Sequence, residues 1–417
     1  MDKNKRLTVW LPVIIAASIA LGIFIGNHYL SISQGKKRSY SSGNKINAIL
    51  DIIDEQYVDT VSMSKLVEST IPKIFSELDP HSVYIPAEDA SVVNEELEGS
   101  FSGIGVSFNM QTDTILVISV ISGGPAEKAG LLPFDRIISI NDSIFSGKKK
   151  NQGEIMKTLR GAKNSTVKLG VQRGNSPELL YFDVTRGDVP VNSVDVSYEA
   201  AKGIGYIKVS KFARNTYNEF ITAIAKLKQA GCTSFVIDLR GNTGGYMDAA
   251  INMINEFMPE GRLIVYTEGK SFPRSDVYAN GTGTCKDAPI VVLTDEISAS
   301  ASEIFSGAIQ DNDRGTIIGR RTYGKGLVQT QMSLSDGSEM RLTIARYYTP
   351  SGRCIQKKYE MGNTDAYDQD IYNRYMHGEF DSADSIKMDD SLKYQTVGGR
   401  TVYGGGGIMP PASQPMW

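Results

Sequence analysis

Three polar side chains in one stretch of the chain have a spacing suited to acyl-transfer chemistry. Ser300 is followed 25 positions later by Lys325, and four positions after that by Gln329. A serine hydroxyl becomes a nucleophile when a neighbouring base takes its proton. A lysine amine serves as that base only when it is neutral near pH 7, so its reference pKa of about 10.4 must fall by several units through burial.

The immediate neighbours of Lys325 favour such burial. The lysine lies between Gly324 and Gly326, in a tight turn that can point its side chain inward. Gln329 stands two strand pleats further on, where side chains face the same side, and it can orient the amine.

The residues before Ser300 predict the element that positions it. Residues 290–293 form an apolar run typical of a buried strand, and the apolar stripe that follows indicates a helix, namely Ala301, Ile304, Phe305, Ala308 and Ile309. Ser300 is then at a helix N-terminus, where unpaired N–H groups stabilise developing negative charge. An alternative stays open, because Ser300 and Glu303 also match the capping box S-x-x-E.

A second glycine-rich segment follows another predicted strand. The sequence DLRGNTGG comes after the apolar residues 235–237 and precedes an amphipathic helix over residues 247–257. Gly244 and Gly245 would let the backbone approach a ligand closely with exposed N–H groups. An ordinary glycine turn is the alternative. The alternation of strands and helices from residue 188 predicts a mostly parallel sheet.

These motifs together resemble the C-terminal processing (tail-specific) serine proteases. The resemblance rests on DEISASASEIFSGA, DLRGNTGGY, the Ser–Lys and Lys-x-x-x-Gln spacings, LDPHSVYI, GIGVSF, GGPAEKAGL, TPSGR and VYGGGGIMP, which span residues 49–410 in order. It implies a multidomain α/β protein with a crotonase-like (ClpP/crotonase-type) α/β protease core, an inserted, mainly β PDZ domain and an N-terminal helical segment.

The resemblance also implies roles for single residues. Ser300 would be the nucleophile, Lys325 the base and Gln329 the residue that orients it. The N–H groups of Gly244 and Ala301 would form the oxyanion hole. No metal and no organic cofactor would be required.

Residues 99–187 look like the PDZ domain. Apolar side chains alternate over residues 104–108 and 115–119, a short helix is predicted to end at Gly130, and residues 155–159 would line the peptide groove. By resemblance, the carboxylate loop consists of Gly103, Ile104, Gly105 and Val106, which would capture the free, apolar C-terminus of a protein or peptide substrate.

The N-terminus predicts a membrane segment. The basic residues Lys3, Lys5 and Arg6 precede residues 7–25, which carry no charge. We expect residues 1–30 to be an uncleaved signal anchor rather than a cleaved signal, with a buried core helix as the alternative. The catalytic part would then be exported, anchored to the inner membrane and located in the periplasm or outside the cell membrane.

The remaining boundaries follow from composition. We expect a linker over residues 31–43, a helical region over 44–98, the protease core over 188–360 and a polar C-terminal segment over 361–417 that completes the protease region. The chain is expected to be irregular after Arg353. A homo-oligomer or an adaptor is an open possibility for its partners.

Composition excludes several other classes. The 417 residues carry a formal net charge of −3, so no affinity for nucleic acid is implied. Three cysteines lie far apart, which argues against a disulfide framework, and the presence of only three histidines argues against a His-rich metal site. His81 is expected to be a structural turn residue. Histidine scarcity also favours a lysine base.

One motif is a decoy. Residues 319–325 match G-x-x-x-x-G-K, but Gly326 stands where a P-loop has Ser or Thr, and a strand rather than a helix is expected next. Two rivals to the protease remain, a catalytically inactive PDZ-bearing adaptor that binds protein C-termini and a crotonase-like acyl-transfer enzyme.

Overall fold

The computed structural model describes residues 16, 18–20, 42–111, 114–144, 152–382 and 385–413. It divides the chain into two units, residues 1–70 and 71–417. The first unit contains α2 (Ser42–Gln56) and the start of α3 (Met63–Ser76). Most of the predicted anchor, residues 7–25, lies outside the described residues. No helix within the described ranges is long and apolar enough to span a bilayer.

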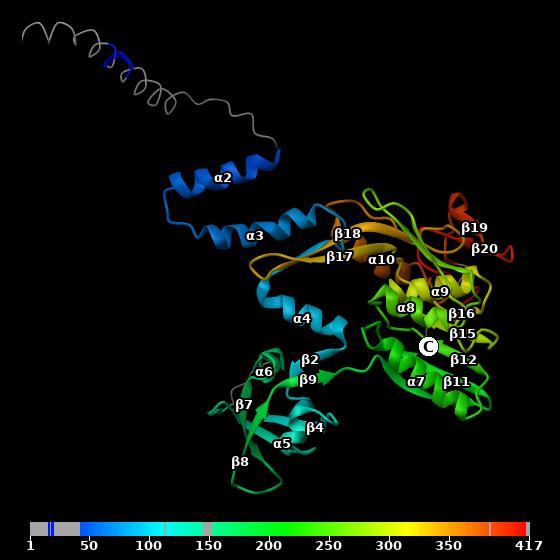
Figure 1. Cartoon of the computed structure of the whole chain (residues 1–417), viewed down its shortest axis with the longest axis horizontal. Helices are drawn as coiled ribbons and strands as arrows, with labels where there is room; N and C mark the ends of the chain where they lie inside the picture. Colours follow the sequence, from blue (N-terminus) through cyan, green and yellow to red (C-terminus); the bar gives the residue numbers. More distant parts are fainter. Residues whose placement is uncertain are drawn as a thin grey trace, which may run out of the picture. The chain divides into compact units, whose positions relative to one another are not determined.

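A mostly parallel sheet forms the centre of the C-terminal region (Figure 1). The strand order is β10-β11-β12-β15-β16-β21, and every pair except β10–β11 is parallel. The alternation of strands and helices predicts this arrangement, and the prediction is confirmed. The strands are β10 (Val194–Ala201), β11 (Ile204–Val209), β12 (Ser234–Asp238), β15 (Ile290–Thr294), β16 (Thr316–Gly319) and β21 (Ala412–Ser413).

Three helices share one hydrophobic core with this sheet. They are α7 (Thr216–Gln229), α8 (Met247–Asn255) and α9 (Ala301–Asp311), and α8 packs against both of the others. The ring of Phe257 makes edge contacts with Phe220, Phe235 and Phe305 at their meeting point. All 11 residues of α9 are buried. The polar side chains of α9 must therefore find partners inside the protein.

A second, antiparallel sheet carries residues from both sides of the predicted PDZ domain. Its strands are β1 (Val83–Ile85), β18 (Glu339–Tyr348), β13 (Leu263–Glu268), β14 (Ser275–Tyr278) and β17 (Leu327–Ser333). The long strand β18 pairs with β1, β13 and β17. Figure 1 shows β17 and β18 side by side. The sheet thereby joins residues 83–85 to the strand that follows Lys325.

The end of the chain is more regular than the sequence suggests. The prediction of an irregular chain after Arg353 is wrong, because this segment contains α10 (Thr364–Met376), β19 (Lys393–Gln395), β20 (Thr401–Tyr403) and β21. Only Tyr367 and Arg374 of α10 are buried. The sequence of this helix therefore has no broad apolar stripe from which a helix could be predicted. The strand β21 pairs with β16 and so completes the core sheet.

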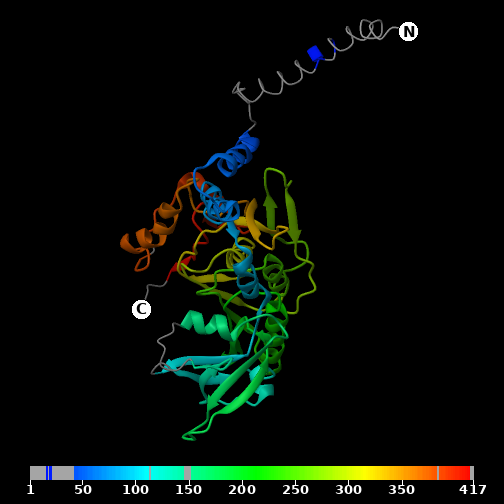
Figure 2. The same ribbon diagram turned by 90° about the vertical axis from the view of Figure 1, so that its left-hand side faces the viewer.

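Residues between α4 (Ala87–Glu98) and β10 form a separate, mainly β body, the cyan-to-green group in Figure 2. Its hydrophobic core includes Ile115, Val117, Ile137 and Ile155. The chain enters and leaves through β2 and β9, which pair antiparallel. The elements are β2 (Ser100–Gly103), β3 (Val106–Gln111), β4 (Thr114–Val120), α5 (Pro125–Ala129), β5 (Arg136–Ile140), β6 (Ser143–Ile144), α6 (Gln152–Leu159), β7 (Thr166–Gln172), β8 (Leu180–Thr185) and β9 (Gly187–Pro190).

A buried ion pair ties the end of α9 to the loop that follows β18, and its removal tests this part of the fold. Arg353 Nη2 lies 2.8 Å from Asp311 Oδ1, and both side chains are fully buried. Arg353→Met leaves the Asp311 carboxylate buried without its partner. We expect the free energy of unfolding, measured with urea, to fall by about 3–5 kcal/mol.

The matched control removes an exposed cation. The Lys358 side chain is 89% exposed and lies 3.9 Å from Asp389. Lys358→Met should change the free energy of unfolding by less than about 0.5 kcal/mol. Equal unfolding curves for Arg353→Met and Lys358→Met would contradict the structural role of the buried pair.

Candidate active site

Ser300 stands at the start of α9 in an unusual backbone conformation. It is the N-cap residue, with φ 55° and ψ −113°. A positive φ is uncommon for a residue with a Cβ, and such strain is concentrated at functional sites. The preceding turn is held by Ser298, whose Oγ donates to Leu239 O at 2.8 Å. The predicted order of strand, turn, serine and helix is confirmed.

The buried carboxylate of Glu303, one turn into α9, connects Ser300 to the lysine turn. Its Oε2 accepts the Ser300 N–H at 2.9 Å and the Lys325 N–H at 2.8 Å. Its Oε1 accepts the Thr322 hydroxyl at 2.5 Å and the Gly324 N–H at 2.8 Å. Burial raises the pKa of Glu303, while these four donors oppose that rise. Since all four neighbours donate, they suit the ionised carboxylate.

Lys325 reaches the partner that the spacing predicts. Its Nζ donates to Gln329 Oε1 at 3.0 Å. Burial lowers the pKa of Lys325, and the positive charge of Arg341 lowers it further. The negative charges of Glu303 and Asp79 act in the opposite direction. The net direction is downward, as a lysine base requires.

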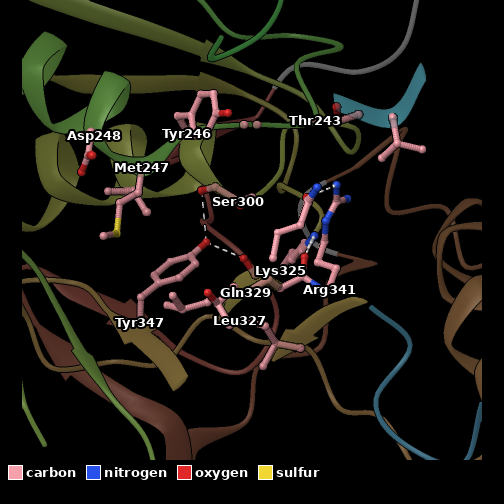
Figure 3. A pocket seen from close by; sticks show the side chains of 17 residues that line it. Thr243, Tyr246, Met247, Asp248, Ser300, Lys325, Leu327, Gln329, Arg341 and Tyr347 are labelled. Atoms are coloured by element: carbon pink, nitrogen blue, oxygen red, sulfur yellow. Dashed lines mark hydrogen bonds between the residues drawn. The ribbon is translucent and has the colours of Figure 1, made fainter. Parts of the chain in front are cut away.

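These residues meet in one cavity of about 600 Å³. Its lining comes from α4, the glycine-rich loop after β12 with the start of α8, the start of α9, the lysine turn with β17, and β18 (Figure 3). The lining residues with a bearing on chemistry or specificity are Gly244, Tyr246, Met247, Ser300, Ile304, Lys325, Leu327, Gln329, Arg341 and Tyr347. The structure thus brings Ser300, Lys325, Gln329 and Gly244 together.

The glycine-rich loop lies directly against the turn of Ser300. At Gly244, with φ 102°, an added Cβ would stand 2.8 Å from Ser300 Cβ and 3.0 Å from Ala301 N. The sequence prediction has the Gly244 N–H exposed, but in the structure it donates to Asn242 Oδ1 at 2.8 Å. The short asparagine side chain makes this bond because it reaches the N–H two residues further along a turn.

Two residues of the site, Tyr347 and Arg341, carry no motif that sequence reasoning could use. Tyr347 Oη lies 3.1 Å from Ser300 O and also contacts Lys325 O, so one buried phenol joins both turns. Arg341 is, like Tyr347, a residue of β18 and lines the cavity. Glu303 has a signal, the S-x-x-E pattern, but the pattern predicts a helix cap and not the contact with the lysine turn.

The predicted carboxylate loop lies in the β-rich body and is not part of this cavity. Ile104 is 2% exposed, and its carbonyl accepts the Ala126 N–H at 2.7 Å. The carbonyl of Gly105 accepts the Ile121 N–H at 3.0 Å. These bonds hold residues 103–106 at the start of β3. The short helix α5 ends at Gly130 in a left-handed conformation, as predicted.

The other candidate residues named from the sequence do not line the cavity of Ser300 and Lys325. His377 Nδ1 contacts Asn373 O on α10, and the three cysteines are free thiols. No group of three or more His, Cys, Asp or Glu side chains in the described ranges is arranged to hold a metal ion. The decoy P-loop ends in the strand β17 rather than a helix, as expected.

The chain is similar to known proteins of one peptidase family. Residues 203–365 match peptidase family S41, and residues 102–195 match the PDZ domain. The chain is 35% identical over 318 residues to the carboxy-terminal processing protease CtpB of Bacillus subtilis (strain 168), covering 76% of this chain and 66% of that protein.

A second relative agrees. A probable CtpA-like serine protease of Staphylococcus aureus (strain N315) is 33% identical over 365 residues, covering 86% of this chain and 72% of that protein. The solved photosystem II D1 C-terminal processing protease has 28% identity and a TM-score of 0.42, covering 75% of this chain and 90% of that chain. The chain therefore belongs to peptidase family S41, as a serine peptidase of the carboxy-terminal processing type with a PDZ domain.

Proposed function

We propose that this peptidase works through a Ser300–Lys325 dyad. Ser300 Oγ attacks a peptide carbonyl while the neutral Lys325 amine takes the hydroxyl proton and later delivers it to the leaving amine. Gln329 orients the amine. The observation that carries the proposal is the Glu303 carboxylate, which bonds the N–H groups of both Ser300 and Lys325 and so holds the two turns together.

The oxyanion of the tetrahedral intermediate would be stabilised by the N–H groups of Ala301 and Gly244. Ala301 is the first residue of α9, and the first N–H groups of a helix lack intrahelical partners. The Gly244 N–H would donate to the oxyanion and to Asn242 Oδ1 at the same time, or it would leave Asn242 Oδ1 and donate to the oxyanion alone. A glycine loop beside a helix N-terminus also supports our proposal of a crotonase-type core.

The PDZ domain would capture the free C-terminus of a protein or peptide substrate. A chain end added as a strand beside β3 places its carboxylate at Gly103, Ile104, Gly105 and Val106. Apolar, unstructured C-termini fit this mode, and cleavage would follow near that end. An inactive adaptor with the same PDZ domain is the alternative. The presence of the Ser300 hydroxyl and the Lys325 amine in one cavity favours the enzyme.

We further propose that the peptidase is exported. The basic residues 3–6 and the uncharged residues 7–25 support an anchor in the inner membrane, with the catalytic part in the periplasm or outside the cell membrane.

The lysine base predicts a specific pH dependence. Only the neutral amine accepts the Ser300 proton, so kcat should rise with pH through the lowered pKa of Lys325. Lys325→Arg stays protonated and should be nearly as inactive as Lys325→Ala and Ser300→Ala, each at least about 1,000-fold below wild type. Lys325→His should keep a trace of activity.

The measurement is mass spectrometry of the C-terminus of a model protein substrate, repeated across pH with peptide hydrolysis rates. Circular dichroism establishes that each variant is folded. An active Lys325→Arg enzyme would rule out the dyad, and cleavage by Ser300→Ala would move the nucleophile elsewhere.

The glycine loop lies so close to the turn of Ser300 that we expect any side chain at position 244 to reduce activity. The Cβ of Gly244→Ala would stand 2.7 Å from Ala299 O, so the loop must move away from Ala301 N. We expect kcat to fall at least about 100-fold, the effect of losing one oxyanion donor. The control is Gly241→Ala, since Gly241 also has a positive φ, 72°, but no atom lies within 4 Å of the added Cβ. A similar kcat for both variants would contradict the assignment.

The carboxylate loop predicts discrimination between chain ends. Amidation of the C-terminus of a peptide substrate removes its charge and one acceptor oxygen, so kcat/KM should fall about tenfold or more. Binding of the free and amidated peptides to Ser300→Ala, measured by calorimetry, separates capture from cleavage. Equal binding and equal cleavage of the two peptides would show that the domain does not select chain ends.

A further inference from the structure

The orientation of the proposed base, Lys325, depends on which end of the Gln329 side-chain amide faces its amine. The side chain of Gln329 has an acceptor end, Oε1, and a donor end, Nε2, and rotation by half a turn exchanges them. Lys325 Nζ donates to Oε1 at 3.0 Å, while Nε2 donates to the main-chain carbonyl of His81. A carbonyl can only accept. The His81 carbonyl therefore selects the orientation in which Oε1 faces the lysine.

The His81 carbonyl belongs to a tightly bonded turn. Asp79 Oδ1 accepts the N–H groups of His81 at 3.0 Å and of Ser82 at 3.1 Å. Asp79 Oδ2 accepts the Ser82 hydroxyl at 2.5 Å. Thr343 of β18 binds this turn twice, because its Oγ1 donates to Asp79 Oδ1 at 2.9 Å and its N–H donates to Ser82 Oγ at 3.1 Å. Residues 79–82 are thereby attached to the strand that pairs with β17.

The imidazole of His81 attaches the same turn to α10. Its Nε2 lies 2.9 Å from Tyr367 Oη, and the two rings meet edge to face at 5.2 Å. Burial, followed by the positive charge of Lys325, lowers the pKa of His81 to about 4. The ring is thus neutral over the working pH range, and it contacts a phenol rather than the serine.

We propose that the turn formed by Asp79, His81 and Ser82 is a positioning element for the base, which holds the Gln329 amide with its oxygen toward Lys325. The proposal rests on the proposed function and deepens it. The turn lies 248 residues before Gln329, on the far side of the PDZ domain in the sequence. Residues that precede the PDZ domain would then complete the catalytic site.

The charged groups around Lys325 predict opposite shifts of the pH profile. Glu303 on α9 and Asp79 in the turn raise the pKa of Lys325, while Arg341 on β18 lowers it. His81, whose pKa is lowered to about 4, is neutral in this range and adds no charge near Lys325. Asp79→Ala should therefore move the acid limb of kcat to lower pH, and Arg341→Gln should move it to higher pH.

The test is the pH profile of kcat and KM for Asp79→Ala, Ser82→Ala and Thr343→Val, measured with one peptide substrate. Loss of the turn frees the Gln329 amide, so the plateau of kcat should fall at least about tenfold with KM within about twofold of wild type. Asp79→Ala should combine the lower plateau with an acid limb at lower pH, a pair of effects that simple destabilisation does not produce. If Asp79→Ala does not fold, Ser82→Ala and Thr343→Val carry the test.

Two further variants complete the design. Asp89→Ala removes an exposed carboxylate of α4 and should match wild type. His81→Gln keeps the main-chain carbonyl and should lose less than about tenfold in kcat. A loss in His81→Gln as large as that in Lys325→Ala would overturn the proposal, because the ring would then be the base.

The outcomes separate this proposal from the dyad itself. An active Lys325→Arg enzyme refutes the Ser–Lys mechanism. An inactive Lys325→Arg enzyme, together with wild-type plateaus for the turn variants, refutes only the positioning role of the turn.

Discussion

The site depends on the hydrogen bonds that the buried carboxylate of Glu303 accepts. An ionised carboxylate inside a protein costs several kcal/mol unless its oxygens accept enough hydrogen bonds. Glu303 satisfies this requirement with donors from two turns, those of Ser300 and Lys325, which are 25 positions apart in the sequence. The arrangement that satisfies the carboxylate is also the one that brings Ser300 and Lys325, the proposed nucleophile and base, into one cavity. Folding of α9 and assembly of the site are therefore linked.

The same carboxylate creates an electrostatic problem for Lys325 as the proposed base. Its negative charge favours the protonated lysine, which is inactive as a base. Burial of Lys325 and the positive charge of Arg341 act against this effect and lower the pKa. Arg341 lies on β18, which also provides Tyr347 and Thr343. One strand of the second sheet thus contributes to the charge balance, to the contact between the two turns and to the attachment of residues 79–82.

The PDZ domain is connected to the cavity through the end of α4. Glu98, two residues before β2, binds the guanidinium of Arg214 at 2.7 Å and accepts the Tyr246 hydroxyl at 3.0 Å. Tyr246 lines the cavity beside Gly244. The strand pair β2–β9 therefore begins next to the wall of the active site, and the insertion point of the PDZ domain is part of the site's support.

Local patterns in the sequence were sufficient for the elements that carry the chemistry. The apolar run before Ser300, the stripe of α9 and the glycines around Lys325 each reflect the conformation of a short segment, and their spacing predicted the contact between Lys325 and Gln329. The fold of the core sheet followed from the alternation of strands and helices, because that pattern is also local. The helix α10 was missed since most of its surface faces solvent.

Tertiary structure alone decided the contacts between distant segments. Whether Glu303 caps its own helix or also bonds the turn of Lys325 cannot be read from S-x-x-E, because the second set of donors comes from another part of the chain. The contact of Gln329 with the His81 carbonyl, and the contacts of Tyr347 with the turns of Ser300 and Lys325, likewise join segments that are distant in the sequence. Such contacts involve main-chain carbonyls, which every residue possesses, and main-chain N–H groups, which every residue except proline possesses. Residue types therefore do not reveal them. The sequence thus determined which side chains can react, and the packing of α9 between the two sheets decided how they are held.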